Sequence, residues 1–290
     1  MKDYIIFTDS TTDLPDSFVK ENNIEVLPLT FTLEGKDYKN YLDERELSTK
    51  DFYDAMRKGK QPVTAQINSE EFLEAITPFV EKGLDILYIC FSSALSGTFN
   101  SVRLGLEVLK ETHPDANVKV IDSKLASAGE GLLVYYANKF KKEGLSLEEN
   151  FEKTEKFKEK VCAWFTVSDI DTLKRGGRLS NAAAFIANAL KIKPILHISE
   201  EGKLVAKGKK RGRDTSLTTL IAEMEQRIIV EENDVIIIAH GDCLEEAEQL
   251  KNDIESKFGI SNFILTNIGP VIGAHTGPDA MTLFFVGKEK

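Results

Sequence analysis

Small hydroxyl side chains gather where the apolar run 86–91 ends and a helical pattern begins, in the stretch ICFSSALSGTF. Ser92, Ser93, Ser96 and Thr98 all belong to this junction. A helix N-terminus leaves backbone N–H groups without partners, and these donors together with serine hydroxyls favour a bound anion. Few lysines or arginines stand in this loop, so the pattern favours a single carboxylate over a triphosphate.

Three further polar stretches are expected at the same edge of the fold. TDSTTDL (8–14) and IDSKLASAGEG (121–131) each follow an apolar run, and PVTAQI (62–67) is expected to form a loop between helices. In an open α/β sheet, ligands sit beyond the carboxyl ends of the strands. Hydroxyls at helix starts are most often caps, but capping alone does not readily explain several such clusters at one edge. The sequence therefore predicts a polar binding site there.

Two glycine-rich stretches carry the remaining candidates. TLKRGGRLS (172–180) is either a turn with solvated charges or a loop in which Arg175 or Arg178 holds polar groups near the ligand. GPVIGAHTGPDA (269–280) is either a structural turn or a loop in which His275 hydrogen-bonds an acid or an acid-binding serine.

Several other chemistries are disfavoured by the motifs. The segment 202–210 is not a P-loop, because Lys210 stands where Ser or Thr belongs, and the run SAGEGLLV has Val134 where a dinucleotide fingerprint needs Gly or Ala. The cysteines and histidines show no metal-ligand spacing, so we expect neither a metal nor a cofactor. A serine hydrolase with Ser93 and His275 as a dyad stays open, although the G-x-S-x-G elbow is missing.

The 290-residue chain carries a formal net charge of -10. Nucleic-acid binding needs a basic face, so this charge argues against it. The N-terminal apolar run breaks at Thr8 and Asp9, too early for a signal peptide, and the longest apolar runs are too short to span a bilayer. We expect a cytoplasmic protein with no integral membrane segment and at most transient membrane contact. The basic cluster 207–214 is either a solvated turn or a docking patch for an acidic partner.

Alternating strand and helix patterns predict a parallel α/β domain in the first half of the chain. The apolar run 4–9 and the extended segment 24–33 are candidate strands, and the short, continuous apolar runs 86–91 and 118–122 are typical of strands buried on both faces. Helical patterns separate them, and Ser48 and Ser69 are expected to cap two of these helices. The helices are expected at 48–58, 69–82 and 96–112. This βαβ series predicts a right-handed doubly wound sheet.

A hairpin predicts that the sheet of the second half is mixed. The extended runs 195–199 and 203–208 are joined by the turn 200–202, and a purely parallel sheet cannot contain such a connection. Further strands are expected at 162–167, 234–240, 262–267 and 281–287, and helices at 169–173, 180–190, 214–230 and 243–257. The expected fold is therefore α/β, with a domain 1–160 and a domain 161–290.

Eight stretches of this chain resemble the DegV family, the bacterial fatty-acid-binding proteins that work with fatty acid kinase. They occur in the family's order over nearly the whole chain: TDSTTDLP, PVTAQ, FSSALSGTF, IDSKLASAGEG, LKRGGRLS, KPIL, AHGD and IGPVIGAHTGPDA. The resemblance implies a two-domain DegV-like fold, a parallel doubly wound sheet domain plus an α/β domain with a mixed sheet. It also implies a fatty acid buried between the two domains.

The same resemblance assigns roles to individual residues. Thr64 of PVTAQ and Ser93 of FSSALSGTF look like the pair that binds the carboxylate, with Ser92 as the alternative to Ser93. His275 of GAHTGP looks like part of the supporting hydrogen-bond network, which Arg175 of KRGGR joins. The family often has a second hydroxyl after the loop threonine, where this chain has an alanine.

The resemblance implies a lipid-binding subunit and not a self-sufficient enzyme. The chain is expected to bind a long-chain fatty acid and present its carboxylate to a separate ATP-dependent fatty acid kinase subunit, which forms an acyl phosphate for phospholipid metabolism. No catalytic residue, cofactor, metal or nucleic-acid partner is expected of the chain itself. Two alternatives stay open, a serine-dependent lipid hydrolase using Ser93 and a binding module for another small acid.

Overall fold

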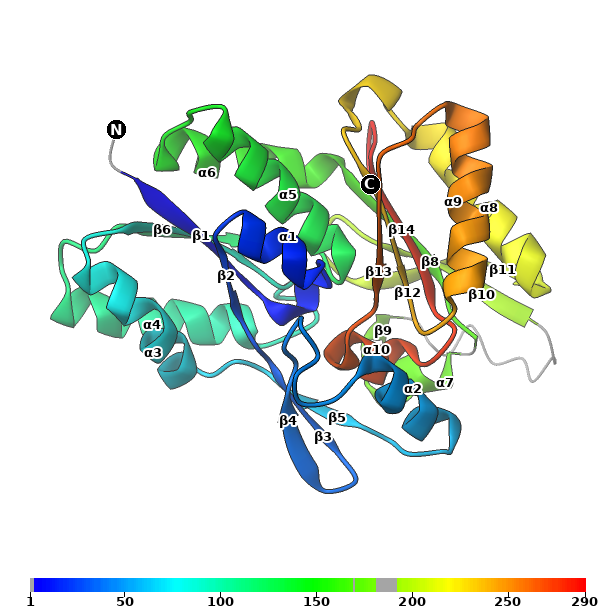
Figure 1. The fold of residues 1–290 in the computed structure, drawn as a ribbon, viewed down its shortest axis with the longest axis horizontal. Helices are drawn as coiled ribbons and strands as arrows, with labels where there is room; N and C mark the ends of the chain where they lie inside the picture. The colour runs from blue at the N-terminus through cyan, green and yellow to red at the C-terminus, as the bar shows by residue number, and fades with distance from the viewer. Residues whose placement is uncertain (1–2, 169, 181–191) are drawn as a thin grey trace.

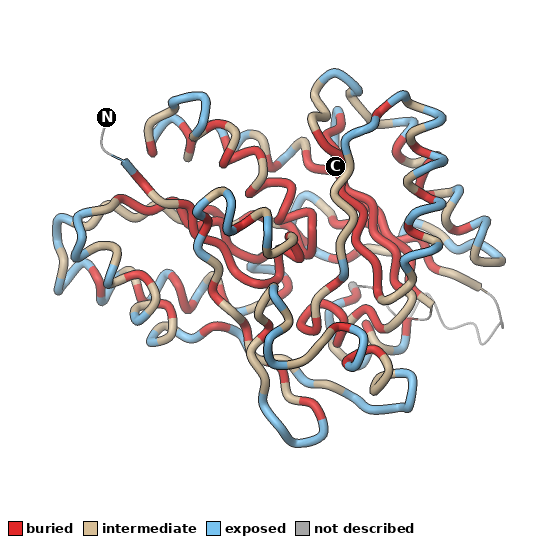
Figure 2. The backbone as a smooth tube through the Cα atoms, in the orientation of Figure 1, coloured by how far each residue is buried: buried red, intermediate tan, exposed pale blue. Residues whose placement is uncertain are grey.

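The computed structural model describes residues 3–168, 170–180 and 192–290. Within these residues the strands form three sheets, of four, seven and three strands. Helix α5 (Ala128–Lys142) lies between the two larger sheets and packs against strands of both (Figure 1). Buried residues concentrate in these two sheets and in α5 (Figure 2). Most residues of α5 are buried, as its position between two sheets requires.

The four-stranded sheet is parallel, as the sequence predicts. It has the order β2-β1-β6-β7 and consists of β1 (Tyr4–Asp9), β2 (Ile24–Leu27), β6 (Asp85–Cys90) and β7 (Val118–Asp122). Every residue of β6 is buried. Leu87 and Ile89 pack in the cluster that includes α5, whereas Ile86 and Tyr88 pack on the opposite face. Burial on both faces is why this strand is continuously apolar.

The seven-stranded sheet is mixed, which confirms the prediction from the hairpin. Strands β10 (Ile192–Ile198) and β11 (Leu204–Arg211) form that hairpin and pair antiparallel. The sheet has the order β13-β12-β14-β8-β10-β11-β9. Its remaining strands are β8 (Val161–Thr166), β9 (Leu179–Ser180), β12 (Ile236–His240), β13 (Phe263–Asn267) and β14 (Met281–Val286).

A three-stranded antiparallel sheet was not predicted. It consists of β3 (Thr30–Leu33), β4 (Lys36–Lys39) and β5 (Val63–Ala65). The prediction of one strand over 24–33 was wrong, because Pro28 has no N–H to continue a ladder and separates β2 from β3. The prediction of a loop over 62–67 was also wrong, since β5 pairs with β3 at three positions: Val63, Thr64 and Ala65.

Helices cover the outer faces of the sheets. Helices α3 (Ser69–Glu81) and α4 (Thr98–Thr112) pack on the parallel sheet on the side away from α5, and α8 (Arg213–Arg227) and α9 (Leu244–Phe258) pack on the mixed sheet (Figure 1). The remaining helical elements among the described residues are η1 (Ser10–Thr12), α1 (Asp16–Glu21), α2 (Thr49–Arg57), α6 (Leu147–Phe157), η2 (Lys158–Lys160), α7 (Asp171–Arg175), η4 (Val230–Glu232) and α10 (Pro270–Thr276).

One predicted helix cap and one predicted loop were wrong. Ser48 caps α2 as expected, but α3 is capped by Asn68, whose side chain accepts from the backbone of Glu71, and not by Ser69. The stretch 269–280 was predicted as a loop, yet Pro270 starts a helix that ends before Gly277. Proline is well suited to the first helical position because its missing N–H would have no partner there. The helix predicted over 180–190 falls outside the described residues, except Ser180 in β9.

The predicted domain boundary falls between η2 and β8. Strands of the parallel sheet all precede residue 160, and strands of the seven-stranded sheet all follow it. One hydrophobic cluster nevertheless contains residues of both sheets, including Leu87 and Phe284. The division into domains 1–160 and 161–290 therefore stays a prediction.

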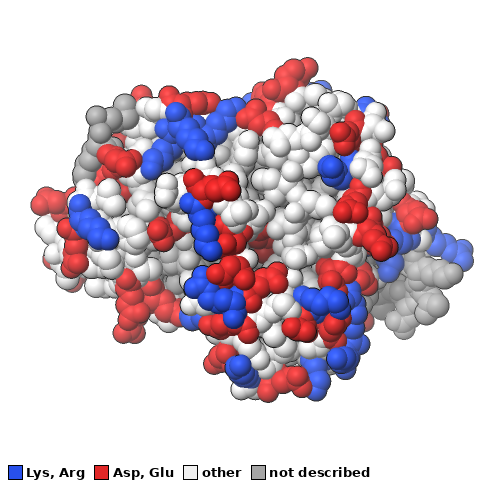
Figure 3. All heavy atoms as spheres, in the orientation of Figure 1, with Lys and Arg blue, Asp and Glu red and all other residues white. Residues whose placement is uncertain are grey.

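The surface carries both signs of charge. Acidic and basic side chains are interspersed over the face shown in Figure 3. The basic cluster predicted as a turn or docking patch instead ends β11, where Lys209, Lys210 and Arg211 are exposed, and its docking role stays a prediction. Among the described residues no helix is long and apolar enough to cross a membrane.

Candidate functional site

A cavity of about 370 Å³ lies beyond the carboxyl end of β6, between the parallel sheet, the mixed sheet and α10. This volume falls in the range of small-molecule sites. Most of its wall is apolar and comes from both halves of the chain. The apolar wall includes Phe91, Leu95, Phe165, Ile198, Leu204 and Phe284. Such a wall can surround a hydrocarbon but leaves no partner for a polar group placed there.

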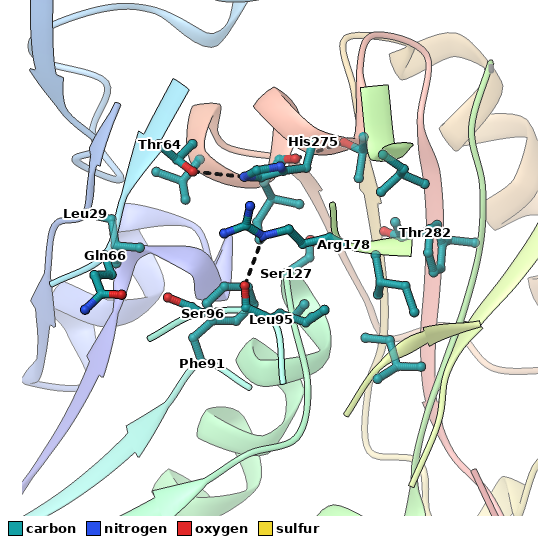
Figure 4. Close-up of a pocket in the computed structure, with 18 of the residues that line it drawn as sticks. Leu29, Thr64, Gln66, Phe91, Leu95, Ser96, Ser127, Arg178, His275 and Thr282 are labelled. Carbon is teal, nitrogen blue, oxygen red and sulfur yellow. Dashed lines mark hydrogen bonds between the residues drawn. The ribbon is translucent and has the colours of Figure 1, made fainter. Parts of the chain in front are cut away.

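Two predicted site residues meet at the polar part of this cavity. The Oγ1 atom of Thr64 on β5 lies 2.9 Å from Nε2 of His275 on α10, and both residues line the cavity (Figure 4). Gly176, at the end of α7, lets the imidazole lie close to the backbone, because a Cβ there would be 2.2 Å from Nδ1 of His275. The ring is thus fixed between β5 and α7.

The imidazole of His275 is neutral at neutral pH. Burial, followed by the nearby charge of Arg178, lowers the pKa of His275 to about 4. Its Nδ1 atom is buried and has no hydrogen-bond partner among the described residues. A neutral imidazole has one donor and one acceptor nitrogen, and a hydroxyl can play either role. The Thr64–His275 pair can therefore turn a donor toward an incoming acceptor.

Arg178, not Arg175, is the arginine at the cavity. Arg178 lines it between His275 and Ser96, and its Nε donates to the carbonyl of Leu95 at 3.1 Å (Figure 4). Its guanidinium also donates to the carbonyl of Gly176. Arg175 is exposed, donates to Oγ1 of Thr172 at 3.1 Å and does not line the cavity. Among the described residues that line the cavity, the one positive charge comes from the second arginine of the predicted loop.

The structure does not bring Ser92 or Ser93 to Thr64. Ser93 is exposed, and its hydroxyl donates to Oδ2 of Asp122 at 2.6 Å. Ser92 is buried, and its hydroxyl donates to the carbonyl of Gly202 at 2.9 Å. Neither serine lines the cavity. Their hydroxyls hold the loop after β6 to its neighbours, so no Ser93–His275 dyad is formed in this structure.

Ser96 is the serine of this junction that faces the cavity (Figure 4). Its Oγ lies 3.0 Å from Oγ1 of Thr98 and accepts the backbone N–H of Thr98 at 3.2 Å. The sequence offered one signal, because Ser96 directly precedes Gly97, the N-cap of α4. The first donors of a helix have no intrahelical partners, so a hydroxyl at this position adds to a set of free donors.

The geometry suits an amphipathic anion. Two hydroxyls, a neutral imidazole and one guanidinium, from Thr64, Ser96, His275 and Arg178, face the polar part of the cavity. A guanidinium and hydroxyl donors can together hold a carboxylate, and charge-assisted hydrogen bonds are the stronger ones. Most of the rest of the wall is apolar, although Gln66, Ser127, Thr276 and Thr282 also line the cavity. A molecule with one acidic end and a long hydrocarbon part matches both regions.

A family model described as DegV family matches residues 4–288. The chain belongs to the DegV family. A DegV domain-containing protein of Clostridium perfringens is 44% identical over 290 residues, which is 100% of this chain and 99% of the relative. The expected membership is thereby confirmed.

Solved DegV-like structures share the fold over the whole chain. A DegV family protein of Thermus thermophilus, described as binding fatty acid, has a TM-score of 0.87 and 28% identity and covers 99% of this chain and 100% of its own. A stearic acid-binding protein of Eubacterium ventriosum has a TM-score of 0.88 and 25% identity and covers 98% of each chain. These matches confirm the expected DegV-like α/β fold.

Proposed function

We propose that this DegV-family protein binds a long-chain fatty acid in the cavity between its two halves. The observation that carries the proposal is one cavity whose lining is mostly apolar but also contains Thr64, Ser96, His275 and the guanidinium of Arg178. Solved relatives described as binding a fatty acid or stearic acid support it. In this proposal the carboxylate lies at Thr64, Ser96, His275 and Arg178, and the acyl tail packs against Phe91, Phe165 and Phe284, all of which line the cavity.

The tail supplies most of the affinity in this proposal. Each buried methylene contributes about 0.8 kcal/mol, so a long acyl chain gains on the order of 10 kcal/mol before the costs of ordering it. The head group gains less, because its hydrogen bonds in the protein replace hydrogen bonds to water. The polar residues therefore set the direction in which the fatty acid lies, and the apolar wall sets how tightly it is held.

We further propose that the carboxylate is presented to a separate ATP-dependent kinase subunit. The polar region is the accessible part of the cavity, since Thr64 and Ser96 are half-buried and Gly97 and Arg178 are exposed, whereas Phe165, Leu173 and Phe284 are buried. A carboxylate oxygen would attack the γ-phosphorus of ATP and form an acyl phosphate as the bond to the departing ADP breaks. In this proposal the chain binds and orients the acid, and the partner supplies the chemistry.

Native mass spectrometry of the protein purified from a bacterial host tests the binding. We expect an added mass equal to one long-chain fatty acid, lost on delipidation and restored by added stearate. A protein that carries no acyl chain and does not retain stearate would contradict the proposal. A fluorophosphonate probe tests the hydrolase alternative in the same preparation, since stoichiometric labelling of Ser93 would favour a hydrolase.

A hydroxylamine trap for acyl phosphate tests the presentation step. The purified chain with oleate and ATP is expected to give no hydroxamate, and addition of a fatty acid kinase subunit is expected to give it. Hydroxamate formed by the chain alone would contradict the assignment as a binding subunit.

A further inference from the structure

The buried carboxylate of Asp13 joins three segments that are far apart in the sequence. Its Oδ2 accepts the hydroxyl of Ser127 at 2.5 Å, and its Oδ1 accepts the backbone N–H of Gly269 at 2.9 Å. Its own carbonyl accepts the hydroxyl of Thr266 at 2.8 Å. Asp13 is only 3% exposed. The loop after β1 is thus tied by one residue to the starts of α5 and α10.

The two helices whose N-cap residues hydrogen-bond Asp13, α5 and α10, both form walls of the cavity. Ser127 is the N-cap residue of α5 and itself lines the cavity. Gly269 is the N-cap residue of α10, whose later residues Ile272 and His275 line the cavity. A change in the position of the Asp13 carboxylate therefore acts on two walls at once.

Ser127 has a backbone conformation that is unfavourable for a residue with a side chain. Its φ of 53° and ψ of -150° lie in a region that glycine occupies almost alone. Such a conformation persists only where the surroundings hold it. Asp13 also has a left-handed φ of 49°, which aspartate tolerates better than most residues. The hydrogen bond between these two side chains connects two locally strained positions.

Helix α10 has little freedom to adjust if its first turn moves. A Cβ at Gly273 would lie 2.6 Å from Oη of Tyr53, so this helix packs directly against the buried ring. Oη of Tyr53 also donates to the carbonyl of Ile268 at 2.8 Å, just before the helix. At the other end, the ring of His275 contacts Gly176. The short helix is thus held at both ends, and its position sets where the imidazole meets β5.

We propose that Asp13 is a positioning residue for the polar part of the cavity. Its carboxylate fixes the starts of α5 and α10 and so holds His275 against Thr64. The consequence for ligand affinity rests on the proposed fatty-acid function, but the effect on the imidazole concerns only atoms of the protein. Asp13 has no ion pair with a described residue, so hydrogen bonds, and not a paired charge, carry this role.

Three variants test the proposal. Asp13→Gly removes the carboxylate without adding strain, because glycine adopts a positive φ freely. Asp13→Asn is the conservative variant, since its amide keeps one acceptor for Gly269 and one donor for Ser127 and tolerates the same backbone. Gly269→Ala acts from the other side, because the added Cβ would lie 2.9 Å from Oδ1 of Asp13, while its φ of -67° suits alanine.

The ring of His275 is the readout, followed by NMR titration of the delipidated protein. In wild type its pKa is about 4. We expect Asp13→Gly and Gly269→Ala to raise this pKa by about one pH unit, because a displaced ring is better solvated, and Asp13→Asn to leave it near the wild-type value. His197 on β10 is the internal reference, because burial lowers its pKa to about 4 as well and it lies outside the cavity.

Stearate affinity is the second readout. We expect about tenfold weaker binding in Asp13→Gly and Gly269→Ala, and near wild-type binding in Asp13→Asn.

An unchanged pKa of His275 in both Asp13→Gly and Gly269→Ala would overturn the proposal. Equal shifts of His275 and His197 would overturn it too, because they would reflect general loosening. If Asp13→Gly does not fold, the His275 titration and the stearate affinity of Gly269→Ala test the proposal alone. A wild type that binds no stearate refutes the proposed function, while the His275 titration still tests the role of Asp13.

Discussion

Thr64 and His275 form a hydrogen bond of 2.9 Å in the cavity, although one lies on β5 and the other on α10. The bond joins the three-stranded sheet to the helix that follows the mixed-sheet strand β13. Neither residue is charged at neutral pH, since burial keeps the imidazole neutral. A hydroxyl and a neutral imidazole that are already oriented can donate a hydrogen bond to a carboxylate without a large rearrangement.

Replacing Thr64 by valine should weaken ligand binding more than folding. Valine keeps the β-branched shape that suits β5 but removes the hydroxyl that pairs with His275. We expect about tenfold weaker stearate binding by titration calorimetry and a change in the free energy of unfolding below about 1 kcal/mol. Thr32→Val on neighbouring β3 is the matched control, because that hydroxyl bonds Asp37 outside the cavity. Wild-type affinity in Thr64→Val would show that the hydroxyl is not a ligand contact.

Alanine substitutions of Ser93 and Ser96 are expected to have opposite outcomes for stearate affinity. Ser96 lines the cavity, so Ser96→Ala should weaken stearate binding by about three- to tenfold. Ser93 is exposed and bonds Asp122, so Ser93→Ala should leave affinity within about twofold of wild type and change stability only slightly. The two variants are each other's control. Loss of affinity in Ser93→Ala alone would restore the assignment expected from the sequence.

Much of the architecture could be predicted because it depends on local pattern. The strand β6 is a continuous apolar run, and such runs are typical of strands buried on both faces. The hairpin between β10 and β11 follows from a short turn between two extended runs. Thr64 and His275 could be singled out because the family motifs are specific in combination, although each alone is not, and each of the two motifs contains one such side chain.

Arg178 and Ser96 could not be identified from the sequence, because the direction in which their loops turn is not encoded by a local pattern. Arg175 is the last residue of α7, so the chain direction changes before Arg178, which reaches the cavity instead. Ser92, Ser93 and Ser96 are chemically alike in the sequence, and only the tertiary structure turns Ser96 inward. Likewise β5 is recognisable only through its pairing with β3, a contact between distant parts of the chain.

The buried carboxyl of Asp13 should give stability a measurable pH dependence. Burial raises the pKa of Asp13 from its ordinary 3.8 to about 7. The folded state therefore binds this proton more tightly than the unfolded chain, and the stability that it contributes is present below about pH 4 and is lost as pH rises through 7. We expect the difference in unfolding free energy between wild type and Asp13→Asn to fall by a few kcal/mol, in order of magnitude, over this window.

Urea denaturation of both proteins at several pH values between 4 and 8 measures this difference. Burial also raises the pKa of Asp9 and of Glu130, but these carboxyls are present in both proteins, so their contributions largely cancel in the comparison. A difference that stays constant over the whole range would mean that Asp13 does not hold a proton in the folded protein.

The apolar wall should select the length of the bound chain. Leu204 is 7% exposed and lines the cavity, so Leu204→Phe places extra volume where the tail is proposed to lie. Loss of two buried methylenes at about 0.8 kcal/mol each would weaken binding of the original chain by roughly tenfold. The co-purified fatty acids should therefore shift toward shorter chains, as read by native mass spectrometry. Leu104→Phe on α4 makes the same chemical change at a residue that is 50% exposed and should leave the profile unchanged. An unaltered profile in a folded Leu204→Phe protein would mean that the tail does not reach β11.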